Sequence, residues 1–294
     1  MNICKNYSIP HSVSEALSAL ANAPDEARII AGGTDLLLDI QQGRHPPVHT
    51  LVDITQIPEL TALEIRGAQI FIGAAVTHKK ISTSPIVCEH AQALATACGM
   101  IGGPQVRNTA TLGGNVAHGL PAADGTIALM ALGAQAEIVD SDGARRIPLG
   151  EIFLGPGQTI LDPRKEILTG FYIGLRRPWE ASAFNRIMRP QGVAIAILNL
   201  ALWLRLEGDV LADVRIAIGP SGPVPRRMLE TEEVLRGHPL TGEKLEVACR
   251  ALRGEAQFRT SRHRATREYR QKMAAVLLDI TLKEAYQRAA SKTL

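Results

Sequence analysis

Two glycine-rich segments about eighty residues apart contain the residue types that bind phosphate. The first covers residues 31–35 (Ala-Gly-Gly-Thr-Asp) and the second covers residues 111–115 (Thr-Leu-Gly-Gly-Asn). Glycine has no Cβ and tolerates positive φ, so backbone N–H groups in such loops can approach a phosphate closely. One loop of this kind would be weak evidence, whereas two in one domain predict a clamp on a diphosphate. The pattern favours a dinucleotide such as FAD, held by a fold other than the Rossmann fold.

Short elements flank both segments and would position them. A strand is expected over residues 27–30, directly before the first segment, and helical turns are expected over 34–40, directly after it. A helix that begins there would direct its positive end toward a bound anion. The other elements expected before residue 176 are helices over 12–23, 77–81, 86–98 and 124–134, and strands over 49–54, 69–73, 136–140 and 167–175.

The composition changes near residues 176–178 (Arg-Arg-Pro), where we expect a domain boundary. Two strands and three helices are expected beyond it. In the last helix, Met273, Val276, Leu277 and Ile280 would share one face. These elements are strands over 193–206 and 210–218, joined by a turn at residues 208–209, and helices over 231–236, 242–252 and 265–290. The predicted fold class is α+β, with a first domain over residues 1–176 and a second, a small antiparallel sheet plus helices, over residues 177–294.

Composition argues against several function classes. The 294 residues include 32 basic and 29 acidic side chains, and only 4% are aromatic, which does not favour nucleic-acid binding. The four cysteines form no CxxC pair and do not cluster with histidine, so this chain alone is not expected to bind a metal or an iron–sulfur cluster. No apolar run approaches the roughly 18–20 residues of a membrane span, and no secretion signal begins the chain. We expect a cytoplasmic protein.

The second glycine segment ends a longer motif that resembles a family signature. Residues 101–115 (IGGPQVRNTATLGGN) are similar to Ile-Gly-x-x-Gln-Ile-Arg-Asn-x-Gly-Thr-Ile-Gly-Gly-Asn, which is typical of the FAD-binding subunits of molybdenum hydroxylases. That family includes the medium subunit of carbon monoxide dehydrogenase and the flavin part of xanthine dehydrogenase. Residues 31–36, residues 121–124 (Pro-Ala-Ala-Asp) and the pair Tyr269-Arg270 also resemble the family, so the resemblance extends over almost the whole chain.

The resemblance implies a fold and a set of cofactor contacts. It implies a two-subdomain FAD-binding domain of the PCMH type, like that of vanillyl-alcohol oxidase, followed by a C-terminal domain of the carbon monoxide dehydrogenase flavoprotein type. The first segment would contact the FAD diphosphate and ribityl chain, and the second would close the other side. The residues it implies for FAD binding are Ala31, Gly32, Gly33, Thr34, Asp35, Leu36, Arg107, Asn108, Thr111, Gly113, Gly114, Asn115, Ala123, Asp124, Ile167, Leu168 and Arg186.

The start of the second domain departs from the family pattern. Family members often have Lys-x-x-Arg followed shortly by Asp-x-Ala, whereas here Arg186 replaces the lysine and Ala194 replaces the acid. Because this region often lies near the flavin edge, the departures bear on the choice of electron acceptor. The cysteine-rich insertion of the hydroxybenzoyl-CoA-reducing subfamily is missing from the sequence, which disfavours that identity.

Some of these residues have a second interpretation. Arg107 could bridge carbonyls of its own loop instead of binding phosphate, and Asp35 and Asp124 could cap the helices that follow them. His78 and His118 could shuttle protons, but no carboxylate or cysteine accompanies either at catalytic spacing.

A basic segment in the last third of the chain also has two interpretations. Residues 253–272 contain seven basic and two acidic side chains. The segment is either a solvated helix face or a docking surface for another subunit.

The sequence contains no nucleophile–base pair, which fits a subunit whose flavin carries the chemistry. The resemblance implies a large partner subunit with a molybdopterin cofactor, a small partner subunit with two [2Fe-2S] clusters, and a dimer of such heterotrimers. FAD on this chain would take electrons from the clusters and deliver them to an external acceptor such as NAD, a quinone, ferredoxin or oxygen. The alternatives are a self-contained FAD oxidoreductase and a scaffold that has lost FAD, although intact glycines in both segments argue against the scaffold.

Overall fold

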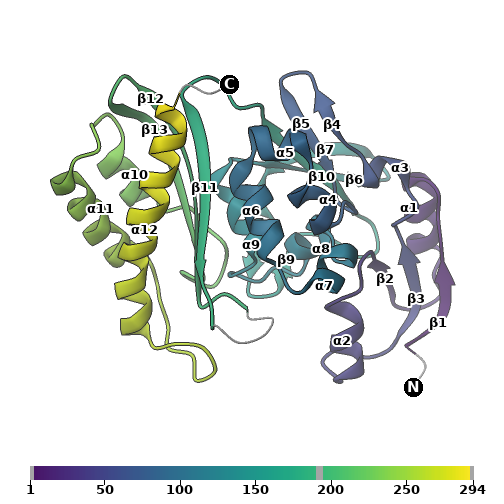
Figure 1. The fold of residues 1–294 in the computed structure, drawn as a ribbon. Coiled ribbons are helices and arrows are strands. Elements are labelled where there is room, and N and C mark those ends of the chain that lie inside the picture. Colours follow the sequence, from purple (N-terminus) through teal and green to yellow (C-terminus); the bar gives the residue numbers. More distant parts are fainter. Residues whose placement is uncertain (1–2, 190–194, 292–294) are drawn as a thin grey trace.

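A small parallel sheet lies at the N-terminal end of the fold (Figure 1). The computed structural model describes residues 3–189 and 195–291. Three strands pair in the order β1-β3-β2, with α1 and α2 beside them. Ser12 caps α1, because its Oγ accepts a hydrogen bond from the Glu15 N–H at 3.2 Å. The elements are β1 (Cys4–Ser8), α1 (Val13–Ala21), β2 (Ala27–Ile30), α2 (Leu36–Gln41) and β3 (Val48–Asp53).

An antiparallel sheet of five strands follows, in the order β4-β5-β10-β6-β7. Its central strand β10 pairs with β5 on one side and β6 on the other. Seven of its eight residues are buried, as expected for a strand covered on both faces. The strands are β4 (Leu63–Arg66), β5 (Gln69–Gly73), β6 (Gln135–Asp140), β7 (Gly143–Pro148) and β10 (Ile167–Gly174), with a small hairpin of β8 (Phe153–Gly155) and β9 (Gln158–Thr159).

Short helices fill the space between this sheet and the C-terminal part of the chain (Figure 1). Every residue of α9 is buried, because α9 packs on α6 and on strands β12 and β13. Small side chains such as Gly125, Ala128 and Ala131 let this helix fit between two layers. The helices are α3 (Pro58–Thr61), α4 (His78–Ser82), α5 (Pro85–His90), α6 (Gln92–Met100), α7 (Pro104–Thr109), α8 (Leu112–Ala117), α9 (Asp124–Ala131) and the 3₁₀ turn η1 (Leu149–Ile152).

The C-terminal part is an antiparallel sheet, β11-β12-β13, with helices on its outer face (Figure 1). Along β12, Leu200, Leu202 and Leu204 face the outer helices, whereas Ala201 and Trp203 face the inner ones. Burial on both faces explains why this strand is an almost unbroken apolar run in the sequence. The elements are β11 (Glu180–Ile187), β12 (Leu198–Glu207), β13 (Val210–Gly219), α10 (Leu229–Leu235), α11 (Gly242–Glu255) and α12 (Arg267–Ala290).

Several local predictions differ from this structure. The helix predicted over 86–98 is two helices, α5 and α6, which are separated at Ala91 (φ −138°, ψ 51°). The second glycine segment is not a loop, because Gly113 and Gly114 lie in the first turn of α8. The face predicted for the last helix is wrong in part, since Val276 and Ile280 are exposed. Strands β1, β4 and β11 were not predicted.

Part of the predicted strand over 193–206 lies outside the described residues, as does Ala194. The predicted boundary at 176–178 falls between β10 and β11. The domain limits 1–176 and 177–294 stay predictions.

Candidate functional site

The two glycine-rich segments lie against each other. A Cβ at residue 32 would be only 2.3 Å from the carbonyl oxygen of Thr109 and 2.7 Å from the Cα of Ala110. Gly32 therefore lets the first segment approach the backbone just before Thr111. Gly33, which follows, has φ +65°, a conformation that favours glycine. Segments that are far apart in the sequence thus share one site.

The second segment is held by backbone hydrogen bonds to the end of β5. The N–H of Gly113 donates to the Ala74 carbonyl at 2.8 Å, and the N–H of Leu112 donates to the Val76 carbonyl at 3.1 Å. A Cβ at residue 113 would lie 2.5 Å from the Cβ of Ala74. Thr111 caps α8, because its Oγ1 accepts from the Gly114 N–H at 3.2 Å. The helix start is therefore fixed between the two subdomains.

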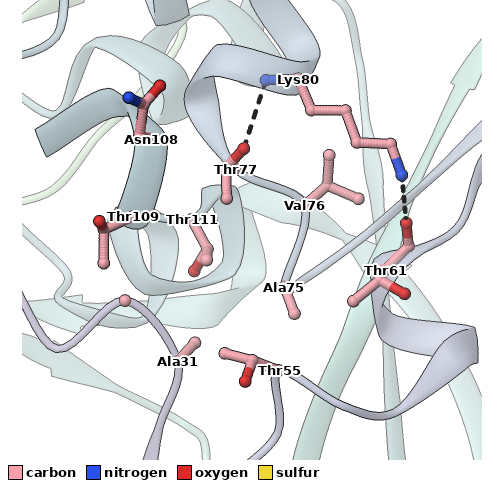
Figure 2. Close-up of a pocket in the computed structure, with 11 residues that line it drawn as sticks. Ala31, Thr55, Thr61, Ala75, Val76, Thr77, Lys80, Asn108, Thr109 and Thr111 are labelled. Carbon is pink, nitrogen blue, oxygen red and sulfur yellow. Dashed lines mark hydrogen bonds between the residues drawn. The ribbon is translucent and has the colours of Figure 1, made fainter. Parts of the chain in front are cut away.

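A cavity of about 330 Å³ opens where these segments meet (Figure 2). Five threonines and one lysine provide most of its polar groups, and no acid lines it. Lys80 spans one side, where its Nζ donates to the Thr61 carbonyl at 2.8 Å (Figure 2). The lining residues are Ala31, Gly32, Thr55, Thr61, Ala75, Val76, Thr77, Lys80, Asn108, Thr109 and Thr111.

A second cavity of about 400 Å³ shares Ala31 and Thr111 with the first. Its lining mixes polar side chains, such as Arg28, Gln158 and Glu166, with apolar ones, and it extends from β2 and α8 to the start of β10. The lining residues are Arg28, Ile29, Ala31, Ile54, Ala74, Thr111, Gly113, Gly114, Ala117, Gly157, Gln158, Thr159, Leu161, Pro163, Glu166, Ile167 and Leu168. Together the two cavities form one site in which polar and apolar groups are mixed.

The chemistry of this site fits FAD. The backbone N–H groups of residues 32–35 donate no hydrogen bond to any group in the described ranges, so they remain free for an anion. Hydroxyl groups, one ammonium group and the absence of acids in the first cavity suit a diphosphate. The apolar side chains of the second cavity, such as Ile29, Ile54 and Leu168, suit ring systems.

Some of the residues predicted to bind FAD line these cavities and others do not. Those in the lining are Ala31, Gly32, Asn108, Thr111, Gly113, Gly114, Ile167 and Leu168. Those outside it are Gly33, Thr34, Asp35, Leu36, Arg107, Asn115, Ala123, Asp124 and Arg186. Asp35 occupies the N-cap position of α2, but its side chain makes no capping hydrogen bond.

Two polar residues outside the lining have structural contacts. Arg107 Nη1 donates to the carbonyls of Ile101 and Gly102, at 3.0 and 2.7 Å, so it bridges carbonyls of its own loop. Asn115 Oδ1 accepts from the N–H and the hydroxyl of Thr126, at 3.0 and 3.2 Å, and so ties α8 to α9. Both side chains stabilise the frame around the second glycine segment.

Asp124 belongs to a buried polar cluster between the two halves of the chain. Its Oδ2 accepts from Arg186 Nη1 at 2.6 Å, and its Oδ1 accepts from Asn199 Nδ2 at 2.5 Å. Burial raises the pKa of Asp124 above its usual value, although Arg186 and Asn199 act in the opposite direction. The residue at the N-cap of α9 is Ala123, so the interpretation of Asp124 as that cap is wrong.

The remaining titratable candidates lie on different helices, with His118 half-buried at the C-cap of α8 and His78 in α4. His78 is 1% exposed at the start of α4, and burial lowers its pKa to about 4, so it is neutral at pH 7. In the described ranges, no group of three or more His, Cys, Asp or Glu side chains could hold a metal ion. None of the helices there is both long and apolar enough to cross a membrane.

Seven residues that line the first cavity were not predicted from the sequence: Thr55, Thr61, Ala75, Val76, Thr77, Lys80 and Thr109. Thr55 and Thr61 flank α3, and Thr77 and Lys80 belong to the segment at α4. The available signal was a threonine and a lysine within the helix predicted over 77–81, which follows an apolar strand. Only the three-dimensional contact between Thr77 and Thr111, an isolated β-bridge, connects them with the glycine segments.

Comparisons with known proteins match almost the whole chain. Residues 2–174 match the family model described as the FAD binding domain in molybdopterin dehydrogenase, and residues 182–285 match the CO dehydrogenase flavoprotein C-terminal domain. The nicotine 6-hydroxylase medium subunit of Paenarthrobacter nicotinovorans is 34% identical over 96% of this chain and 97% of its own length. The carbon monoxide dehydrogenase medium chain of Hydrogenophaga pseudoflava is 31% identical over 87% of this chain and 91% of its own.

Solved structures agree with these matches. A chain of carbon monoxide dehydrogenase from Hydrogenophaga pseudoflava superposes with a TM-score of 0.91 at 29% identity, covering 97% of this chain and 98% of that one. A chain of quinoline 2-oxidoreductase from Pseudomonas putida 86 gives 0.88 at 26% identity, with 97% of both chains covered. The predicted α+β class, with an FAD-binding domain followed by a C-terminal domain, is confirmed. The chain belongs to the family of FAD-binding subunits of molybdenum-containing dehydrogenases, and FAD is the cofactor of its first domain.

Proposed function

We propose that this chain is the electron-transfer subunit of a multi-subunit molybdenum hydroxylase and that FAD binds in the two connected cavities. The observation that supports this proposal is the close approach of Gly32 to the backbone at Thr109. This approach brings free N–H groups and hydroxyl groups together at a cavity that no acid lines. When bound, FAD supplies the two-electron redox chemistry.

The chain's own residues bind and orient the cofactor in this proposal. The N–H groups of residues 32–35 and the hydroxyls of Thr77 and Thr111 would hold the diphosphate, with Lys80 adding positive charge. Ile167 and Leu168, at the start of β10, would pack on a ring system. The other predicted residues outside the lining would act from the surrounding frame: Leu36, Arg107, Asn115, Ala123, Asp124 and Arg186.

The proposed assembly follows from the relatives. The two relatives are named as a medium subunit and a medium chain, and such a name implies that each belongs to a complex with further chains. We propose a large subunit with a molybdopterin cofactor and a small subunit with two [2Fe-2S] clusters, arranged as a dimer of heterotrimers in the cytoplasm. The clusters would deliver electrons to this chain, and an external acceptor would remove them.

A visible absorption spectrum of the complex purified from its native host, together with a gel, tests the proposal. We expect about one flavin per copy of this chain, an iron–sulfur shoulder and two companion chains. Rapid-mixing absorption should then show that the iron–sulfur bands are reduced before or together with the flavin band when substrate is added.

Other outcomes would contradict it. Flavin with a single chain on the gel would favour a self-contained oxidoreductase. A colourless chain that does not bind added FAD would leave a scaffold role.

A pair of lysine variants tests the cavity itself. Lys80→Gln should weaken FAD binding, whereas the control Lys79→Gln, which changes its exposed neighbour, should not.

A further inference from the structure

One arginine of the last helix is buried, with no ion pair to an acid in residues 3–189 and 195–291. Arg270 lies near the start of α12 and is 2% exposed. Among the same described residues, its Nε has no hydrogen-bond partner. The ionisable groups that act on its guanidinium are two further arginines, Arg264 and Arg259, and no carboxylate is among them. This part of the basic segment is therefore not a solvated helix face.

Two nearby arginines act on Arg270 as like charges: Arg264, which is half-buried, and Arg259, which is exposed. Burial and the charges of Arg264 and Arg259 lower the pKa of Arg270, and burial and Arg259 lower the pKa of Arg264. Arginine nevertheless stays protonated in proteins, so the charges remain. A buried charge is costly unless it is paired, and neighbouring like charges add to that cost.

The two acids of the same segment are occupied elsewhere. The carboxylate of Glu255 accepts from the N–H and hydroxyl of Thr231, at 3.1 and 2.9 Å. Glu268 is fully exposed and interacts with Thr266 and its own backbone.

The rest of the chain offers no obvious substitute. Residues 1–2, 190–194 and 292–294, which the structure does not describe, include no Asp or Glu.

We propose that Arg259, Arg264 and Arg270 bind a carboxylate side chain of a partner subunit, an inference that rests on the proposed function. Guanidinium groups bind carboxylates in a bidentate manner and tolerate burial in interfaces better than ammonium groups. A charge that is buried permanently calls for a permanent partner, which favours a subunit over an electron acceptor that exchanges. An acidic side chain of the partner, Asp or Glu, would complement the positive charge of the three arginines.

The test compares the full chain alone with the complete complex. The variants are Arg270→Gln and Arg264→Gln, and the matched control is Arg262→Gln, which changes an exposed arginine of the same loop. In the complex, we expect each of the first two variants to raise the dissociation constant for the partners at least tenfold and to reduce its salt dependence. The control should stay within twofold of the wild type. A photo-crosslinker at position 262 should capture a partner peptide that contains Asp or Glu.

The isolated chain provides the second readout. There Arg270→Gln should keep or raise the thermal midpoint and keep the FAD content, because an unpaired buried charge is removed. If it lowers the midpoint by as much as it weakens the complex, Arg270 acts as a structural residue and the proposal is wrong. If inorganic phosphate stabilises the wild type but not Arg270→Gln, and subunit affinity is unchanged, the site binds a small phosphate instead.

Failure of the proposed function would look different. Wild-type protein without FAD or without companion chains would contradict the proposed function before any arginine is changed. Normal FAD content, normal assembly and unchanged affinity in both variants would contradict the arginine site alone.

Discussion

Arg186 Nη1 lies 2.6 Å from Asp124 Oδ2, so a strand of the C-terminal sheet holds the first residue of a fully buried helix in the preceding domain. Both side chains are 7% exposed. A buried ion pair gives little net stability, but removing one partner leaves an uncompensated charge. The pair therefore makes the two halves of the chain depend on each other.

This relationship predicts that Asp124→Asn lowers the free energy of unfolding by about 3–5 kcal/mol. Urea denaturation of the full chain measures the change. Glu64→Gln is the control, because its pair with Arg66 is largely exposed and should contribute less than about 1 kcal/mol. Equal losses in the two variants would contradict the prediction.

Replacing Gly32 by alanine should separate the two glycine segments. The new Cβ would lie 2.3 Å from the Thr109 carbonyl oxygen, so the backbone must move. We expect a loss of about 1–3 kcal/mol in stability and FAD retention below half. Gly174→Ala meets nothing within 4 Å and should retain FAD. The flavin-to-protein absorbance ratio and the thermal midpoint report both effects, and full FAD retention in Gly32→Ala would refute this view of the site.

Arg107→Gln should act on stability and not on phosphate binding. It removes hydrogen bonds to the Ile101 and Gly102 carbonyls, which we expect to cost about 1–3 kcal/mol. FAD affinity, measured by titration well below the melting temperature, should change by less than threefold. A large loss of affinity with unchanged stability would show instead that Arg107 binds the diphosphate.

His78 makes stability depend on pH. Its pKa is about 4 in the folded chain, below the usual 6.5, because burial disfavours the charged form. The neutral, buried His78 therefore makes its full contribution to the free energy of unfolding above pH 6.5. This contribution, up to about 3 kcal/mol, is lost as the pH falls toward 4.

Urea denaturation between pH 7.5 and 4.5 tests this dependence. His78→Gln should flatten the change relative to wild type, and His238→Gln, an exposed histidine, should not. An identical pH profile in all three proteins would rule out the contribution of His78.

The sequence predicted the elements whose pattern is local. The strands at residues 27–30 and 69–73 have their predicted bounds, because a short apolar run between turn residues is a local signal. Strand β11 was missed because its buried side chains are mostly small. Ala181 and Ala183 are buried, and Ser182 Oγ accepts from the Ala93 N–H at 3.1 Å, a contact that only the fold creates.

Only part of the candidate site was predicted from the sequence. The glycine segments were recognised, but α8 was predicted as a loop because glycine is a poor helix former. Its glycines are in a helix because that helix begins against Ala74. Thr55, Thr61 and the pair Thr77 and Lys80 come from three segments separate from the glycine segments, so no spacing in the sequence assigned them to the cavity.

The apolar face of α12 was misplaced for a related reason. The face of α12 that is buried against the sheet contains small side chains such as Ala274 and Ala285. Val276 and Ile280 lie on the exposed face of the helix. Arg270 lies on the buried side, which a rule that places charges in solvent would not predict.

Backbone atoms at Thr109 and Ala74 occupy the space that a Cβ would need at Gly32 and Gly113, whether or not a ligand is present. A descendant that no longer bound FAD would have to keep both glycines merely to fold. Their presence therefore says little about cofactor loss, and it does not weigh against a scaffold as the sequence alone suggested. Erosion would show first at Thr55 and Lys80 of the first cavity, which cap no helix, whereas Thr77 and Thr111 also cap α4 and α8. Thr55 and Lys80 are therefore the positions to inspect when judging whether a family member still carries its flavin.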